Sequence, residues 1–322
     1  MKNFIKKIAF ILLGSNLRIR YRMKKIGDKK VLTILNLHSV RRDDGSAYKP
    51  LEPAIFEELL RFLVKNFTLI TFGDLVESNL TKEFGKPLLI ISFDDGYKDF
   101  IDVTVPILFK YKIKVNQNLI PECIDSGEPP LNVLIQDFIG KASDSELRNI
   151  NIPGFVVGQK LDNRIQIGLR VSKYIKNKPM SEQRIIKEKI LEVAGNLPSF
   201  KGTPMMNIDD VKELTELHEF GAHSYSHASM EFETDSYVLD DLIKCKDWFN
   251  VNLGQKVDIY AFPNGKFKKN HIQLAKDCGY KHILLVNDLF SSLETEVHYR
   301  FGFSAENNLE MKFRALGSFS EI

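Results

Sequence analysis

Short apolar runs alternate with amphipathic helical patterns along most of the chain, and this alternation restricts the fold more than any other feature. Seven runs bounded by polar or turn residues predict buried strands at 31–37, 67–71, 87–93, 113–119, 219–222, 257–262 and 281–286. Helical patterns lie between them at 53–65, 98–110, 207–218, 235–252 and 268–278, with Pro106 expected to kink the second and Gly279 to end the last. The alternation predicts an α/β fold whose parallel sheet is closed, or nearly closed, into a barrel.

Residues 125–206 interrupt this alternation. They contain no convincing strand, and helical patterns recur near 131–140, 160–176 and 181–194. We therefore expect a helical insertion at about 125–206, between the fourth and fifth strands. Such an insertion either caps a site at the end of the barrel or is a purely structural excursion.

The net positive charge of the chain comes from its N-terminus alone. The net charge is +3, but residues 1–30 hold ten Lys and Arg against one acid, which leaves 35 basic and 41 acidic residues elsewhere. The apolar run 8–13 is far shorter than the roughly 20 residues that span a bilayer, and no small-residue cleavage site follows it. We expect residues 1–30 to form a basic amphipathic segment that either lies on an anionic membrane surface or packs on the domain.

The location of the protein is predicted from the same segment. On a membrane surface, the inserted side chains would be Phe4, Ile8, Ile11, Leu12 and Leu13. The three cysteines lack the spacing of metal ligands, which favours a reducing compartment. We expect a cytoplasmic protein, peripheral on the inner face of the membrane, with a secreted or envelope-associated location as the alternative.

Two adjacent carboxylates follow a strand that is apolar on both faces. The run 88–93 leads directly into Asp94, Asp95 and Gly96. Parallel α/β proteins carry their active sites at the carboxyl ends of strands. If one carboxylate binds a cation there, the cation keeps its neighbour ionised as a base. The alternative is an Asp that caps the next helix, with Gly96 in the turn.

Two histidines four residues apart follow a later strand. His223 and His227 come directly after the run 219–222. On one helical turn both imidazoles would face one ion, and with a carboxylate they suit zinc, cobalt, nickel or iron. Such a pair can also be exposed and idle. Combined with Asp95, it predicts a catalytic metal site with positions open for water and substrate.

Four motifs in chain order resemble those of the polysaccharide deacetylase (NodB-homology) family. The segment 92–96 (SFDDG) is similar to the family's TFDDG motif, and 223–227 (HSYSH) is similar to H(S/T)xxH. In one branch of the family, 35–40 (LNLHSV) resembles LxYHxV and 261–265 (AFPNG) resembles AYPYG. Four motifs in the right order are far more specific than any one of them.

The resemblance implies a distorted seven-stranded (β/α) barrel with a helical insertion, and a catalytic domain over 31–322. It implies hydrolysis of N-acetyl groups on amino sugars of a polysaccharide or a lipid-linked glycan. Asp94 would be the general base, and Asp95, His223 and His227 would hold a divalent metal, zinc above all, or cobalt or nickel. The backbone N–H of Asn264 would stabilise the oxyanion. No nucleic acid is expected as a partner.

The chain departs from the family pattern at two functional positions. The family's Leu-x-His motif, which carries a general acid, has no counterpart in 284–286 (LLV). His38 is the first candidate for that acid, unless local hydrogen bonds occupy it, and His298 is the second. The family's base-orienting Arg is also missing from its usual place. Arg300 could pair with Asp94 from the last loop, or form a surface salt bridge.

Other activities are compatible with parts of this pattern. Removal of a formyl or O-acetyl group would use the same residues. A non-haem iron oxygenase also uses two His and one carboxylate, but its usual HxD order is absent. A non-catalytic carbohydrate-binding relative would explain the missing acid, although it would have no need of Asp94. Tyr97 and Tyr225 are candidates for stacking on sugar rings.

Overall fold

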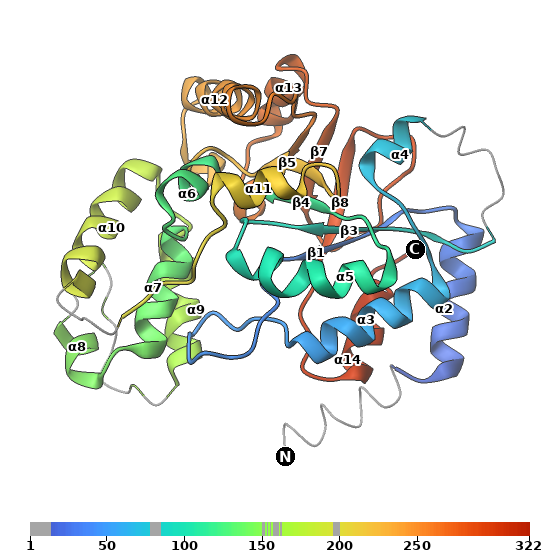
Figure 1. Cartoon of the computed structure of the whole chain (residues 1–322), viewed down its shortest axis with the longest axis horizontal. Coiled ribbons are helices and arrows are strands. Elements are labelled where there is room, and N and C mark those ends of the chain that lie inside the picture. Colours follow the sequence, from blue (N-terminus) through green and yellow to red (C-terminus); the bar gives the residue numbers. More distant parts are fainter. Residues whose placement is uncertain are drawn as a thin grey trace.

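Seven parallel strands close into a barrel (Figure 1). The computed structural model describes residues 14–77, 85–149, 163–195 and 200–322, with the single positions 152, 154, 156 and 161. The strands in these residues are β1 (Thr33–Leu37), β2 (Thr68–Leu69), β3 (Leu88–Phe93), β4 (Asn116–Leu119), β5 (Glu219–Ala222), β6 (Ile259–Ala261), β7 (His282–Val286) and β8 (Val297–Gly302). Their order is β1-β8-β7-β6-β5-β4-β3-β2, and β1 also pairs with β3, which closes the ring and leaves β2 outside it. The predicted seven-stranded barrel is confirmed.

The strand that completes the barrel differs from the predicted one. The run 67–71 forms only the two-residue β2, which pairs with the start of β3. The seventh barrel strand is β8, which the sequence analysis missed and which lies between β7 and β1. Two of its buried side chains are His298 and Arg300. Polar residues at these positions disrupt the apolar alternation by which a buried strand is recognised.

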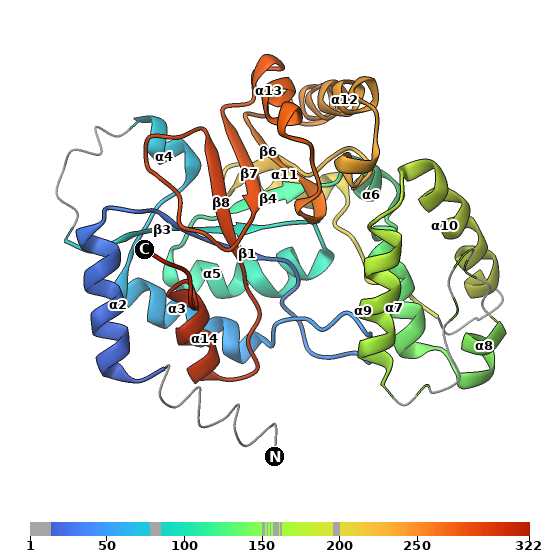
Figure 2. The ribbon, with the colours of Figure 1, turned by 180° about the vertical axis from the view of Figure 1, so that it is seen from behind.

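Helices cover the outside of the barrel (Figures 1 and 2). They are α3 (Pro53–Asn66), α4 (Phe72–Glu77), α5 (Val105–Tyr111), α11 (Ile208–Leu214), α12 (Asp235–Leu253), α13 (Lys269–Asp277) and α14 (Asn308–Ala315). The predicted helix 98–110 is divided into a π-helical turn, Phe100–Thr104, and α5, with Pro106 in the first turn of α5. Pro106 lacks the N–H that a continuous helix would use, so the break falls there.

The barrel interior changes from apolar to polar along the strands. Side chains two apart on a strand share a face, so Ile34 and Ile90 join Ala261 and Leu284 in one apolar cluster. Two residues further along β1 and β3, the inward side chains are Asn36 and Ser92, which contact Arg300. The next inward position on the β3 side is Asp94. An apolar base therefore supports a polar layer, and the carboxylates lie above it.

The segment between β4 and β5 is helical, as predicted, in the residues that the structure describes. It contains α6 (Pro121–Ser126), α7 (Leu131–Lys141), α8 (Asp144–Asn149), α9 (Arg164–Ile175) and α10 (Met180–Gly195). These helices have an apolar cluster of their own that includes Phe138, Val171 and Ile186. In both views α7 to α10 group on one side of the barrel.

The described part of the basic N-terminal segment is α2 (Asn16–Asp28), which packs on the domain. Ile19 and Ile26 are buried in the main core. The guanidinium of Arg22 donates to the carbonyl oxygens of Leu316, at 2.7 Å, and Ser320, at 3.0 Å. The five side chains expected to enter a membrane lie outside the described residues. No helix among the described residues is long and apolar enough to cross a bilayer.

Candidate active site

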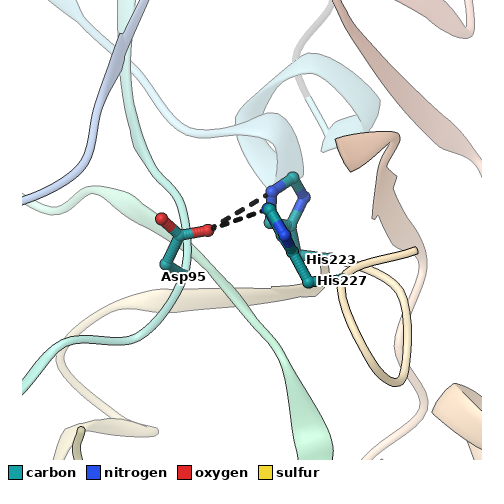
Figure 3. Close-up of side chains that lie close together, drawn as sticks. All are labelled: Asp95, His223 and His227. Atoms are coloured by element: carbon teal, nitrogen blue, oxygen red, sulfur yellow. Dashed lines mark ion pairs between the residues drawn. The ribbon is translucent and has the colours of Figure 1, made fainter. Parts of the chain in front are cut away.

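Three potential metal ligands converge above the polar layer of the barrel. Asp95 follows β3, while His223 and His227 follow β5. One carboxylate oxygen of Asp95 (Oδ1) lies 3.5 Å from Nε2 of His223 and 3.6 Å from Nε2 of His227 (Figure 3). All three side chains are buried, and their ligand atoms lie within 4.8 Å of one another. The carboxyl ends of two strands thus bring together the three ligands predicted from the sequence.

These three side chains fit a divalent cation. Oδ1 of Asp95 is buried and has no hydrogen-bond partner among the described residues, and such an orphaned carboxylate oxygen is costly unless it is coordinated. Nδ1 of His223 lies 2.8 Å from the carbonyl oxygen of Ala261, so this nitrogen carries the proton and Nε2 keeps its lone pair. Burial lowers the pKa of His227 to about 3, which keeps the imidazole neutral. Nitrogen and oxygen ligands of this kind suit zinc, cobalt or nickel.

The two histidines lie on a loop, and the predicted helical turn is wrong. Residues 223–229 have no helical hydrogen bonding, and the φ angles of Ser224 and His227 are 59° and 61°. The buried carboxylate of Asp241, on α12, accepts from the Ser224 hydroxyl at 2.8 Å and from the Tyr225 N–H at 3.0 Å. The Ser224 hydroxyl oxygen in turn accepts from the N–H of Ala228 at 3.0 Å. Side-chain bonds, not helix geometry, therefore bring His223 and His227 together.

Asp94 is held by a bidentate pair with Arg300. Two guanidinium nitrogens donate to the two carboxylate oxygens at 2.7 and 2.9 Å, and both side chains are buried. Burial by itself would raise the pKa of Asp94, but the charge and hydrogen bonds of Arg300, with smaller contributions from His223 and His38, together outweigh it and hold the pKa well below its usual range. Asp94 is therefore ionised at neutral pH. The pairing of Arg300 with Asp94 was expected from the last loop, but Arg300 lies on β8. The alternative, a surface salt bridge of Arg300, is wrong, because the side chain is buried.

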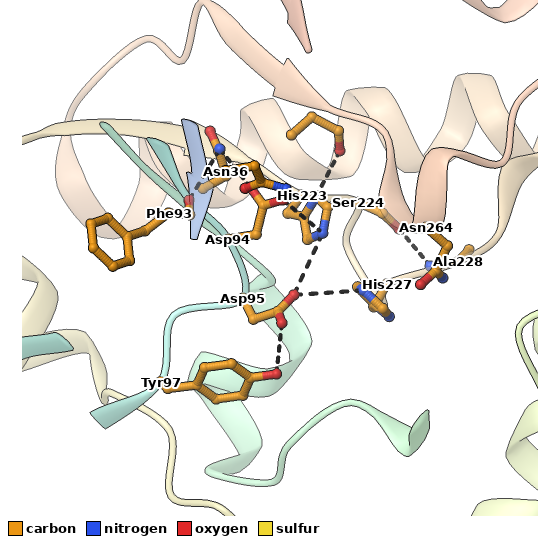
Figure 4. A network of polar contacts seen from close by, with 12 residues as sticks. Asn36, Phe93, Asp94, Asp95, Tyr97, His223, Ser224, His227, Ala228 and Asn264 are labelled. Carbon is orange, nitrogen blue, oxygen red and sulfur yellow. Dashed lines mark hydrogen bonds and ion pairs between the residues drawn. The ribbon is translucent and has the colours of Figure 1, made fainter. Parts of the chain in front are cut away.

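Tyr97, two residues after Asp95, orients the metal-facing carboxylate. The Tyr97 hydroxyl donates to Oδ2 of Asp95 at 2.6 Å, which leaves Oδ1 directed at the histidines. Figure 4 shows the contacts from Asp95 to Tyr97, His223 and His227. Tyr97 is only 1% exposed, so it cannot stack on a sugar ring, and that expectation is wrong.

The remaining predicted residues separate into two groups. His38 and Asn264 line the same cavity as the ligands. Burial lowers the pKa of His38, while the charges of Asp95 and Asp94 oppose this. Asn264 has a φ of 60°, and its side-chain amide donates to the Ser229 hydroxyl at 3.1 Å. His298, by contrast, lies near the start of β8, 3.1 Å from His282 at the start of β7. It is at the opposite end of the barrel and cannot serve the site.

The polar residues below Asp94 are part of the site but were not predicted from the sequence. The Asn118 amide donates to Oδ1 of Asp94 at 2.8 Å and to the Ser92 hydroxyl at 3.1 Å. Asn36 and Ser92 both accept from Arg300. A signal was present, because 116–118 (NQN) places polar residues at successive positions of a buried strand. Buried polar groups need partners, so such a run predicts a hydrogen-bond network.

The ligands open into a cavity of about 390 Å³, within the range of small-molecule sites. One wall comes from the loop after β1, with Tyr48 and Lys49, and from the helical insertion, with Asn132 and Lys176. Val286, at the end of β7, also lines the cavity. The resemblance places the family's general acid at that position, so the cavity has an apolar side chain there.

Comparisons with known proteins agree with the barrel fold. The family model described as polysaccharide deacetylase matches residues 81–283. Among solved structures, the deacetylase PplD from Streptococcus pyogenes, in complex with acetate, has 16% identity and a TM-score of 0.59, over 89% of this chain and 98% of that chain. IcaB from Ammonifex degensii has 12% identity and a TM-score of 0.55, over 89% and 97%. No curated protein sequence matches the chain.

Proposed function

Because the chain belongs to the polysaccharide deacetylase family, we propose that it hydrolyses N-acetyl groups on amino sugars of a polysaccharide or a lipid-linked glycan, with a divalent cation at Asp95, His223 and His227. The observation that carries this proposal is the orphaned Oδ1 of Asp95 between two imidazoles. The ionised, Arg-paired Asp94 lies beside it. A similar structure, that of PplD, is described as a deacetylase in complex with acetate.

The cation, zinc or alternatively cobalt or nickel, would supply Lewis acidity toward the acetyl carbonyl and the attacking water. Asp94 is the proposed general base, since its carboxylate oxygen Oδ2 lies 3.8 Å from Nε2 of His223 and so faces the metal position. Arg300 and Asn118 fix the carboxylate of Asp94 so that it faces the attacking water in a productive orientation.

Two further residues complete the proposed mechanism. The backbone N–H of Asn264 would donate to the oxyanion of the tetrahedral intermediate, a role that does not depend on its side chain. His38, in its protonated form, would give a proton to the departing sugar nitrogen, as the C–N bond breaks and acetate forms. Burial disfavours that form, whereas the negative charges of Asp95 and Asp94 favour it. Besides the metal ligands and Asp94, four titratable side chains of the described residues line the cavity: His38, Tyr48, Lys49 and Lys176. His38 is the imidazole among them.

One observation favours a second function, a carbohydrate-binding protein without catalysis. Val286 replaces the family's acid, and a binding protein would have no need of one. The buried pair of Asp94 and Arg300 supports the catalytic proposal against it. Burying two charges is costly and contributes little net stability, so a binding protein would gain little from this pair.

We also propose that the protein works at the cytoplasmic surface of a membrane, with secretion as the competing outcome. On α2, Leu17 is 80% exposed and Tyr21 64% exposed. Arg20 and Lys24 are exposed on the same helix, so apolar and basic side chains are available together to an anionic interface. Flotation with phosphatidylserine vesicles tests this. Wild type should float, and the L17S/Y21S double variant should not; flotation of both would contradict the proposal.

Acetate release from N-acetylated amino-sugar oligomers tests the enzymatic proposal. Zinc-loaded wild type should release acetate, and His223→Ala should not. Release of formate from N-formyl sugars, or of acetate from O-acetyl sugars alone, would contradict the proposed acyl group. Oligosaccharide binding with no release from any of these substrates would favour the non-catalytic function.

A further inference from the structure

One lysine of the helical insertion reaches the cavity of the metal ligands. Lys176 follows the last residue of α9 and lines the cavity beside Asp95 and His227. Burial lowers the pKa of Lys176, and the charge of Asp95 opposes this. Within the described residues its ammonium group forms no hydrogen bond or ion pair of the usual length. Lysines are seldom left in this state unless a ligand completes their surroundings.

The position of Lys176 is fixed by close packing between the insertion and the loop after β1. A Cβ added to Gly168, on α9, would lie 2.8 Å from Cβ of Ala47, and one added to Gly140, on α7, would lie 2.2 Å from the Gly45 carbonyl oxygen. Ile175, next to Lys176, is fully buried. The close packing of α7 and α9 on the loop after β1 therefore holds Lys176 at the cavity.

A buried carboxylate strengthens this contact between loop and insertion. Asp137, on α7, accepts from the Ser46 hydroxyl at 2.6 Å and from the Thr203 N–H at 2.6 Å. It thus ties the loop after β1 to α7 and to the end of the insertion at Thr203. The same loop carries Lys49, which is exposed and lines the same cavity. Two ammonium groups from separate parts of the chain therefore face one space.

The charged groups of the cavity leave an excess of positive charge once a cation is bound. Arg300 neutralises Asp94, and Lys176 balances Asp95, so the cavity is neutral before a cation enters. A divalent cation adds two positive charges. The proposed reaction does not change this total, because the proton that water gives to Asp94 offsets the negative charge of the oxyanion. Two positive charges are left, apart from Lys49 at the rim. Unbalanced charge in a partly buried cavity is costly, and an anionic group on the substrate would reduce it.

We propose that Lys176 binds an anionic substituent of the substrate, a carboxylate or a phosphodiester on or next to the N-acetylated sugar. Lys176 is then a specificity-determining residue, with Lys49 assisting at the rim. The inference rests on the proposed function for the identity of the sugar. The binding of the anion itself does not require turnover, so the two proposals can be tested separately.

Calorimetric titration of zinc-loaded, full-length protein measures the anion preference directly. All proteins compared, the wild type at position 176 included, carry Asp94→Asn so that no probe is hydrolysed. The probes are the methyl glycoside of N-acetylglucosamine, which is neutral, N-acetylmuramic acid, which carries a carboxylate, and the methyl phosphodiester of N-acetylglucosamine. Wild type should bind at least one anionic probe about tenfold more tightly than the neutral one, as expected for a charged hydrogen bond. The anionic probe that binds more tightly than the neutral one identifies the substituent.

Variants separate the proposed role from a structural one. Lys176→Met should remove the anion preference and leave neutral-sugar binding within about twofold, whereas Lys176→Arg should keep the preference. Lys173→Met, at an exposed position of the same helix, is the matched control and should change neither. Equal affinity of wild type for all three probes would overturn the proposal, and so would equal weakening of all three by Lys176→Met.

Acetate release distinguishes failure of this inference from failure of the proposed function. Equal kcat/KM of the zinc-loaded protein on neutral and anionic sugars would overturn the inference and leave deacetylation standing. An anion preference that depends on Lys176, with no acetate released from any probe, would uphold the inference and overturn deacetylation.

Discussion

Arg300 donates to both carboxylate oxygens of Asp94, at 2.7 and 2.9 Å, inside the barrel. The arginine lies on β8 and the aspartate follows β3, on either side of β1. The pair therefore connects two strands that are not neighbours. It keeps Asp94 ionised and holds it in one orientation beside the metal position.

Replacing Arg300 by Met should leave Asp94 as an unpaired buried charge. We expect a loss of roughly 3–5 kcal/mol of unfolding free energy, the cost of breaking a buried ion pair from one side, together with loss of most turnover. Urea denaturation measures the first. Arg61→Met is the control, because Arg61 pairs with Glu57 and Glu58 at an exposed position, and it should cost far less, since exposed ion pairs contribute little stability. Equal costs would contradict the account.

The same pair should make stability depend on acid pH. Folding lowers the pKa of Asp94, so the unfolded state binds the proton more readily. The stabilisation is therefore complete above the unfolded pKa of about 4 and is lost as the pH falls below it. The stability difference between metal-free wild type and Arg300→Met should be constant near neutrality and shrink in acid. A difference that grows in acid would contradict this sign.

Metal binding should stabilise the fold through three ligands. Zinc at about 100 times its Kd should add about 2.7 kcal/mol to the unfolding free energy, visible as a rise in Tm. His223→Ala and His227→Ala should abolish the rise. His271→Ala is the control, since this buried histidine contacts Asp235, on α12, and lies outside the site. A rise in Tm retained by both ligand variants would place the metal elsewhere.

Tyr97→Phe should weaken metal binding without removing a ligand. It deletes the 2.6 Å hydrogen bond that directs Oδ1 of Asp95 toward the histidines. Loss of such a supporting bond typically costs about 10–100-fold in metal affinity. Competition with a chromogenic chelator measures this. Tyr280→Phe, which loses a buried hydroxyl bonded to the Leu242 carbonyl, should retain wild-type affinity, and an equal loss in both variants would contradict the role of Tyr97.

His38→Gln tests the proposed proton donor. Its kcat should fall by about 10²–10⁴-fold, while zinc still raises Tm as in wild type, because His38 is not a ligand. His298→Gln should keep kcat at temperatures where it is folded, since His298 lies at the opposite end of the barrel. Full turnover by His38→Gln would show that another group protonates the leaving amine.

The sequence was sufficient for the fold class and for the three ligands, because both depend on local patterns. Apolar runs predicted most barrel strands. The positions of Asp95 and the two histidines just after strands predicted that they lie close together. It was insufficient for β8, whose inward residues are His298 and Arg300. Their burial depends on partners from other strands, which no local pattern reveals.

Side-chain contacts across the barrel explain the other differences. The HxxxH spacing suggested a helical turn, yet Ser224 and Asp241 shape a loop that gives the same convergence. Lys176 carried no local signal, because its position in the cavity depends on how α9 packs on the loop after β1. Contacts of this kind join residues far apart in the sequence, and they require the folded structure.

The most direct test of the account is acetate release by Asp94→Asn with its zinc content measured in the same preparation. The account predicts a variant that folds, holds zinc as wild type does, binds the sugar and releases no acetate above background. Acetate release at the wild-type rate would show that Asp94 is not the base, and the proposed mechanism would be wrong.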